Sequence, residues 1–168
     1  KSAARIDILH VPYKGAAPAV TDVIGGQVHG IFADLPVLYP HVTAGKLRAH
    51  SADFSRLCVE ETGAIGIWGH FNTGFAATIL EEAAAMTTQV TGETVPSDYA
   101  GTISMGLRQA AGVCVGMAPW NAPVILGVRA IAMPLACGNT VVLKASELCP
   151  AVHRLIVDAF VEAGLPAG

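Results

Sequence analysis

Apolar residues recur with helical periodicity at the C-terminal end of the chain. Over residues 151–163 they follow i, i+3, i+4 and i+7 spacing behind Pro150. Gly164 follows as a stop signal. Cys149 stands where the N-cap is expected, and cysteine is a poor cap beside serine or threonine. The pattern predicts a helix whose C-terminal end is firmly marked and whose N-terminal end is weakly specified.

A second helical pattern covers residues 71–91 and ends at Gly92. A shorter helix is predicted over residues 54–62. After the long helix, residues 95–98 predict a turn and residues 103–109 a strand. The apolar side of the long helix is expected to hold Phe71, Phe75, Ile79, Leu80, Ala83, Ala84 and Met86.

Two apolar runs further along the chain are typical of buried parallel strands. Residues 112–118 are continuously apolar, and residues 140–143 are rich in β-branched side chains. Between them Pro123 opens a predicted helix over residues 124–136, whose last turn Pro134 is expected to bend or shorten. Together with the C-terminal helix, these segments predict β-α-β-α order with a right-handed crossover.

The first 49 residues predict a short strand-helix-strand unit. Strands are expected over residues 6–13 and 28–33, on either side of a helix over residues 16–24. Residues 35–44 are expected to form a loop or a short helix, because two prolines interrupt them. The predicted fold class is therefore α/β: a partial Rossmann-like open sheet with β-α-β-α order, preceded by helices and a short β-α-β segment.

The composition is apolar for 168 residues: 52% are hydrophobic, 14% are charged, and the mean hydropathy is +0.52. No uninterrupted apolar run reaches the ~20 residues that cross a bilayer, so no membrane span is predicted. Buried strands and core-facing helices explain this composition. The alternative is surface that a partner, or a missing part of a larger protein, covers. The net charge of −3 gives no basic surface for nucleic acid.

The four cysteines show no spacing that suits a metal, so no metal site is predicted. Each lies in an apolar stretch, and buried free thiols are expected. Free thiols favour a reducing compartment. The four are Cys58, Cys114, Cys137 and Cys149.

Near the N-terminus, residues 10–19, 25–28 and 44–49 resemble the tripartite tricarboxylate transporter substrate-binding proteins, periplasmic solute receptors of the Bug type. The resemblance implies a carboxylate ligand bound by backbone N–H groups at Gly15, where the predicted helix begins. A plain strand-turn-helix without a ligand is the open alternative.

Each predicted strand of the second half leads into a specific motif. Pro119-Trp120-Asn121-Ala122-Pro123 follows the first, and Leu143-Lys144-Ala145-Ser146-Glu147 ends the second. This pair resembles the start of the cofactor-binding domain of the aldehyde dehydrogenase superfamily. The similarity extends over residues 52–168, where the sequence most resembles the salicylaldehyde and vanillin dehydrogenase branch. It implies NAD-dependent oxidation of an aromatic aldehyde.

The resemblance also implies roles for individual residues. Asn121 matches a side-chain amide that donates to the oxyanion of the thiohemiacetal, a bond worth ~2.7–4 kcal/mol in a transition state. Lys144 and Glu147 match the pair that contacts the adenosine ribose, and a carboxylate there favours NAD over NADP. The alternatives are a turn asparagine, two solvated charges and ordinary core packing. The residues that match the cofactor-lining wall are Met117, Ala118, Pro119 and Trp120.

Other parts of the family pattern have no match in this sequence. They are the glycine-rich turn that binds the pyrophosphate, the stretch with the general-base glutamate, and the context of the nucleophilic cysteine. We therefore expect a truncated chain that is inactive alone and binds NAD weakly or not at all.

Two segments are predicted: a receptor-like one over residues 1–49 and a dehydrogenase-like one over residues 50–168, in one merged domain if their strands pair into one sheet. Two alternatives to the dehydrogenase fragment are open, a carboxylate-binding piece of a transporter receptor and a recombined, chimeric chain with no evolved ligand. The small-molecule ligand is not identified. The expected partner is a second copy of this chain, through self-association, or a missing half of the chain. The cytoplasm is the expected location, or the periplasm if the receptor-like segment reflects the true origin.

Overall fold

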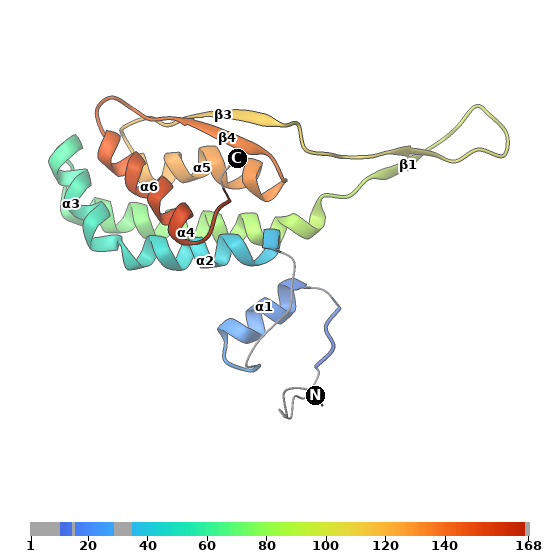
Figure 1. Ribbon diagram of the computed structural model, residues 1–168, viewed down its shortest axis with the longest axis horizontal. Coiled ribbons are helices and arrows are strands. Elements are labelled where there is room, and N and C mark those ends of the chain that lie inside the picture. Colours follow the sequence, from blue (N-terminus) through green and yellow to red (C-terminus); the bar gives the residue numbers. More distant parts are fainter. Residues whose placement is uncertain (1–10, 15, 29–34, 167–168) are drawn as a thin grey trace.

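A computed structural model describes residues 11–14, 16–28 and 35–166 (Figure 1). Five helices pack together beneath a two-stranded sheet, a thin ribbon projects from this body, and one short helix lies apart from it. In chain order the elements are α1 (Ala16–Ile24), α2 (Leu35–Ala49), α3 (Ser51–Thr62), α4 (Gly66–Met86), a 3-10 turn η1 (Thr87–Gln89), β1 (Glu93–Val95), β2 (Ser104–Gly106), β3 (Val113–Met117), α5 (Pro123–Ala136), β4 (Thr140–Lys144) and α6 (Pro150–Glu162).

Helix α4 is the centre of the helical layer and packs against α2, α3 and α5. Its buried side is made mostly of small residues, so the neighbouring helices approach closely. At Gly69 an added Cβ would lie only 2.4 Å from the Cα of Ser55 in α3. The buried residues of α4 are Gly69, Asn72, Thr73, Ala76, Ala77, Leu80, Ala83 and Ala84.

Strands β3 and β4 pair in parallel, from Val113 opposite Thr140 to Met117 opposite Lys144. Helix α5 connects them and covers one face of the pair, and α6 follows β4 (Figure 1). This is the predicted β-α-β-α order, so the α/β prediction is confirmed. The opposite face of the sheet is open to solvent. Its apolar side chains are Val113, Val115, Met117 and Val142, each more than half exposed.

Strands β1 and β2 form an antiparallel ribbon that extends away from the body (Figure 1). Strand β2 is the strand predicted over residues 103–109, but it is shorter. Strand β1 was not predicted, and it ends at Val95, the first residue of the predicted turn. No helix within the described ranges is long and apolar enough to cross a membrane.

Several predictions need correction. Helix α4 covers Gly66–Met86 rather than residues 71–91, and the two parallel strands predicted to be buried expose one face. Residues 35–44 belong to the continuous helix α2, which contains Pro40, because tertiary packing of its buried residues outweighs the local cost of proline. Phe71 and Phe75 are exposed, because alanines rather than aromatic residues fill the core side of α4. Cys137 is exposed and Cys114 half-buried, whereas Cys58 and Cys149 are buried as expected.

The N-terminal strand-helix-strand unit is visible only in part. Helix α1 has the predicted bounds, and Tyr13 donates a hydrogen bond to Asp22 within it at 2.6 Å. Most of the two predicted strands, over residues 6–13 and 28–33, lies outside the described residues, as does Gly15. The carboxylate site and the merged four-stranded sheet therefore stay predictions.

Two glycines of α4 make a matched test of this packing. Gly69→Ala is expected to destabilise the protein by about 1–3 kcal/mol, because its Cβ meets the backbone of α3. Gly74→Ala has no atom within 4 Å and should stabilise by about 0.5–1 kcal/mol. Urea denaturation of both variants measures this. Effects of the same sign would contradict the packing described.

Candidate functional site

The carboxyl ends of β3 and β4 meet at one edge of the sheet. The ladder continues beyond the strands, since the Ala118 N–H donates to the Lys144 carbonyl at 3.0 Å. The two motifs found in the sequence, residues 119–123 and 143–147, therefore lie side by side. Open α/β sheets bind ligands at this edge. We call it the carboxyl edge.

Charged side chains lie on the β4 side of the carboxyl edge. Lys144 Nζ and Glu147 Oε2 are 3.2 Å apart, and both side chains are largely exposed. A hydrogen bond from its own backbone, followed by one from Lys144, lowers the pKa of Glu147 below its ordinary value. Glu147 is therefore an ionised hydrogen-bond acceptor at neutral pH. An exposed pair of this kind stabilises the fold little and is free to exchange partners with a ligand.

Asn121 lies on the β3 side of the carboxyl edge and is exposed. Its backbone carbonyl accepts a hydrogen bond from Trp68 Nε1 of α4 at 3.3 Å. Within the described residues its side-chain amide has no hydrogen-bond partner. The backbone of this loop is thus tied to α4, while the Asn121 amide stays available as a donor.

Three aromatic side chains of α4 form a stacked row beside this loop. The ring centroids of Trp68 and Phe71 are 5.4 Å apart, and those of Phe71 and Phe75 are 5.9 Å apart with nearly parallel planes. They are 38%, 53% and 44% exposed, respectively. We call them the aromatic row. The sequence does contain a signal that these aromatic residues are not core residues. The opposite side of α4 is rich in alanine, and those alanines are sufficient to fill the core.

We call residues 145–149, between β4 and α6, the β4 loop. Side chains and backbone groups packed on the protein side of this loop hold it in place. The Ser146 N–H donates to Nδ1 of His153 at 3.1 Å, and the Leu148 N–H donates to Ser146 Oγ at 3.2 Å. Glu61 of α3 accepts from the Ala151 and Val152 N–H groups, both at 2.9 Å. Glu61 therefore caps α6, the role that Cys149 fills poorly. The sequence gives no local signal for this cap.

The buried thiols are poor nucleophiles. Burial raises the pKa of Cys58 to about 11. Burial also raises the pKa of Cys149. Both are therefore protonated at neutral pH, and the thiolate is the reactive form. In the described part of the chain no three His, Cys, Asp or Glu side chains gather in a way that suits a metal ion.

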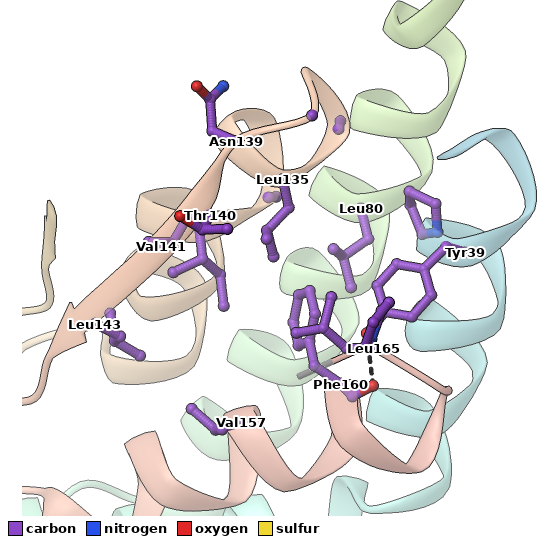
Figure 2. Close-up of a pocket in the computed structure, with 16 residues that line it drawn as sticks. Tyr39, Leu80, Leu135, Asn139, Thr140, Val141, Leu143, Val157, Phe160 and Leu165 are labelled. Atoms are coloured by element: carbon purple, nitrogen blue, oxygen red, sulfur yellow. Dashed lines mark hydrogen bonds between the residues drawn. The ribbon is translucent and has the colours of Figure 1, made fainter. Parts of the chain in front are cut away.

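A cavity of about 340 Å³ lies between β4 and the helices, where Thr140, Val141 and Leu143 of the strand line it (Figure 2). Its lining is mainly apolar, from α2, α4, α5 and α6. Two polar side chains of its wall are already engaged: Tyr39 donates to the Phe160 carbonyl, and Asn139 Oδ1 accepts from the Ala111 and Gly112 N–H groups. The cavity reaches the carboxyl edge only at Leu143 and offers few polar groups to orient a ligand.

The sequence-predicted site residues are brought together at the carboxyl edge. Met117 is opposite Lys144 in the sheet, Trp120 is half exposed beside Asn121, and Ala118 is buried. Asn121 carries a side-chain amide donor on one of the two adjacent loops, and Glu147 carries a carboxylate acceptor on the other. The aromatic row, Glu61 and His153 were not predicted as parts of this site.

A mixed α/β fold with a ligand-binding carboxyl edge is characteristic of nucleotide-binding domains. Residues 41–168 match the model of the aldehyde dehydrogenase family, and residues 1–57 match that of the tripartite tricarboxylate transporter family receptor. The chain belongs to the aldehyde dehydrogenase family. Its N-terminal third carries the resemblance to the receptors, and the two matches overlap over residues 41–57.

Individual relatives agree with this assignment. A vanillin dehydrogenase of Pseudomonas fluorescens is 61% identical over 125 residues, and a salicylaldehyde dehydrogenase of Pseudomonas putida is 46% identical. Each alignment covers 74% of this chain but only 26% of the relative. The chain thus spans about a quarter of the length of these relatives.

The fold is also similar to solved structures. The structure of a salicylaldehyde dehydrogenase from Pseudomonas putida G7, complexed with salicylaldehyde, has a TM-score of 0.76 and 43% identity. The match covers 79% of this chain and 27% of that one. A NAD-dependent benzaldehyde dehydrogenase from Corynebacterium glutamicum has a TM-score of 0.75 and 29% identity, over 79% of this chain and 28% of its own.

The cap on α6 gives a prediction. Glu61→Ala should destabilise the protein by about 1–2 kcal/mol, because two helix N–H groups lose their acceptor. Glu60→Ala is the matched control, since this exposed neighbour only pairs with Arg56 and should change stability by less than about 0.5 kcal/mol. Thermal or urea unfolding measures both. Equal losses would show that Glu61 is not the cap.

Proposed function

We propose that this chain supplies the oxyanion-donor loop and the cofactor-ribose edge of an NAD-dependent dehydrogenase that acts on aromatic aldehydes. The carrying observation is the juxtaposition at the carboxyl edge: the Asn121 loop, whose backbone carbonyl accepts a hydrogen bond from Trp68 of the aromatic row, and the Lys144–Glu147 pair on the adjacent loop. Relatives named as vanillin and salicylaldehyde dehydrogenases support this reading.

The substrate side of the proposal rests on Asn121 and the aromatic row. In an aldehyde oxidation through a thiohemiacetal, negative charge develops on the former carbonyl oxygen. An amide N–H aimed at that oxygen stabilises the charge. The aromatic row offers flat apolar faces on which an aryl ring stacks, in an offset or edge-to-face arrangement. Trp68 ties the two parts together through the Asn121 carbonyl.

The cofactor side rests on Lys144 and Glu147. An ionised Glu147 accepts hydrogen bonds from ribose hydroxyls and repels a phosphate at the 2′ position. NAD is therefore the proposed cofactor and NADP is disfavoured. Met117, Pro119 and Trp120 are proposed to form the wall against which the cofactor lies. NAD supplies the hydride acceptor, and these residues orient it.

The chain alone is proposed to be catalytically silent. Its buried thiols are protonated, and we assign neither a nucleophile nor a general base within it. The activity belongs to an assembly that adds these groups. The proposed location is the cytoplasm, with the periplasm as the alternative if the receptor-like segment directs the chain.

Purified chain is expected to show no NAD reduction with vanillin or salicylaldehyde. It should bind NAD weakly, with a Kd on the order of 1 mM, about −4 kcal/mol. Calorimetry should show further weakening in Glu147→Ala, while Glu93→Ala, an exposed carboxylate on the ribbon, should bind like the parent protein. Turnover by the parent protein that is lost in Asn121→Ala would contradict the proposed lack of activity. Equal affinity in all three proteins would contradict the ribose edge.

The open face of the sheet is proposed to be covered by a second copy or by the rest of a longer protein. Val113, Val115 and Val142 together present an apolar surface that water solvates poorly. Sedimentation velocity of the isolated chain should therefore detect association that rises with concentration. Val115→Thr should weaken it, because the substitution places a hydroxyl in the covered surface. A monomer at every concentration would contradict self-association.

A further inference from the structure

His153 lies directly beneath the β4 loop of the carboxyl edge and is only 1% exposed. Its Nδ1 accepts a hydrogen bond from the Ser146 N–H at 3.1 Å. A backbone N–H only donates, so Nδ1 carries no proton and the ring proton is on Nε2. The contact thus fixes the tautomer of the imidazole as well as the position of Ser146.

The same ring also packs against α5, the helix that follows the Asn121 loop. An added Cβ at Gly127 of α5 would lie 3.1 Å from His153 Cδ2, so the imidazole fills space that α5 leaves open. The Pro123 carbonyl is near enough to raise the pKa of His153, although Nε2 makes no hydrogen bond of normal geometry among the described residues. Pro123 begins α5 directly after the Asn121 loop. The ring therefore lies between the supports of both loops.

We propose that His153 is a positioning residue for cofactor binding, which holds Lys144 and Glu147 in place through the bond from Ser146 to its Nδ1 atom. The role rests on the proposed binding of NAD at this edge. Lys144 and Glu147 are exposed and restrain each other weakly. Their placement therefore depends on the loop backbone, and His153 is the buried side chain that bonds to that backbone between them.

Protonation of His153 would cancel this role. Burial lowers the pKa of His153 below 6.5; the Pro123 carbonyl and Glu61 oppose the shift, and Lys144 adds to it. The Cys149 thiol, 3.9 Å from Nδ1, is the other titratable group in contact. A proton on Nδ1 would make that atom a donor, so it could no longer accept the hydrogen bond from the Ser146 N–H. The stabilising contribution is thus complete above pH 6.5 and is lost as pH falls through the lowered pKa of the folded state.

Hydrogen exchange at the Ser146 amide tests the contact without any ligand. Exchange should be roughly tenfold faster in His153→Phe, which keeps a planar ring but removes the acceptor. His153→Asn offers a side-chain oxygen near the Nδ1 position and should restore protection. Ile156→Val is the packing control, because it trims a side chain beside the same Gly127 and leaves the acceptor intact. Its Ser146 exchange should match that of the parent protein.

The parent protein gives a second readout that needs no variant. Ring ¹⁵N shifts should report a proton on Nε2 at neutral pH, and Ser146 protection should fall as the imidazole titrates in acid. A proton on Nδ1, or unchanged Ser146 exchange in a folded His153→Phe, would overturn the contact.

NAD titration of the same proteins decides the positioning role. The affinity should fall about fivefold or more in His153→Phe and recover in His153→Asn, following Ser146 protection. Loss of Ser146 protection with unchanged NAD affinity would overturn the role. If the parent protein itself binds no NAD, the proposed cofactor edge fails, and so does positioning for NAD, while the exchange rates still decide whether His153 holds the loop.

Discussion

Small side chains along one side of α4 allow α2, α3 and α5 to pack closely around it. Gly69 is the tightest point, where any larger residue would meet the backbone of α3. Because alanines fill this core, the aromatic residues of the helix lie on the other side and form the exposed row. One of them, Trp68, bonds to the loop that carries Asn121. The packing of a single helix thus places an aromatic residue against the backbone of the loop that carries the candidate oxyanion donor.

The carboxyl edge combines exposed chemistry with buried support. Asn121, Lys144 and Glu147 face solvent and make few contacts of their own. Glu61 and His153 lie beneath them and bond to backbone N–H groups of α6 and of the β4 loop. Such contacts fix the loop without using the side chains that would contact a ligand. Mutations in the supporting residues are therefore expected to act on binding through geometry rather than through charge.

The second half of the fold was predictable because its signals are local. Pro123 and Pro150 mark helix starts, and the β-branched run after Gly138 marks a strand, so β3-α5-β4-α6 could be predicted from the sequence. The candidate loops followed from motifs at the ends of these strands. What sequence reasoning missed depends on tertiary contact. The Glu61 cap joins residues 90 positions apart, α2 continues through Pro40 because it is packed, and the exposure of Phe71 depends on which side of α4 becomes the core.

We propose that the carboxyl edge of this chain is preformed for binding the adenosine ribose of NAD. A crystal structure of the chain grown with NAD tests it most directly. We expect the adenosine ribose between Lys144 and Glu147, the Ser146–His153 bond intact, and a nicotinamide end without a fixed position. NAD bound elsewhere on the molecule, or an empty carboxyl edge at saturating NAD, would contradict it.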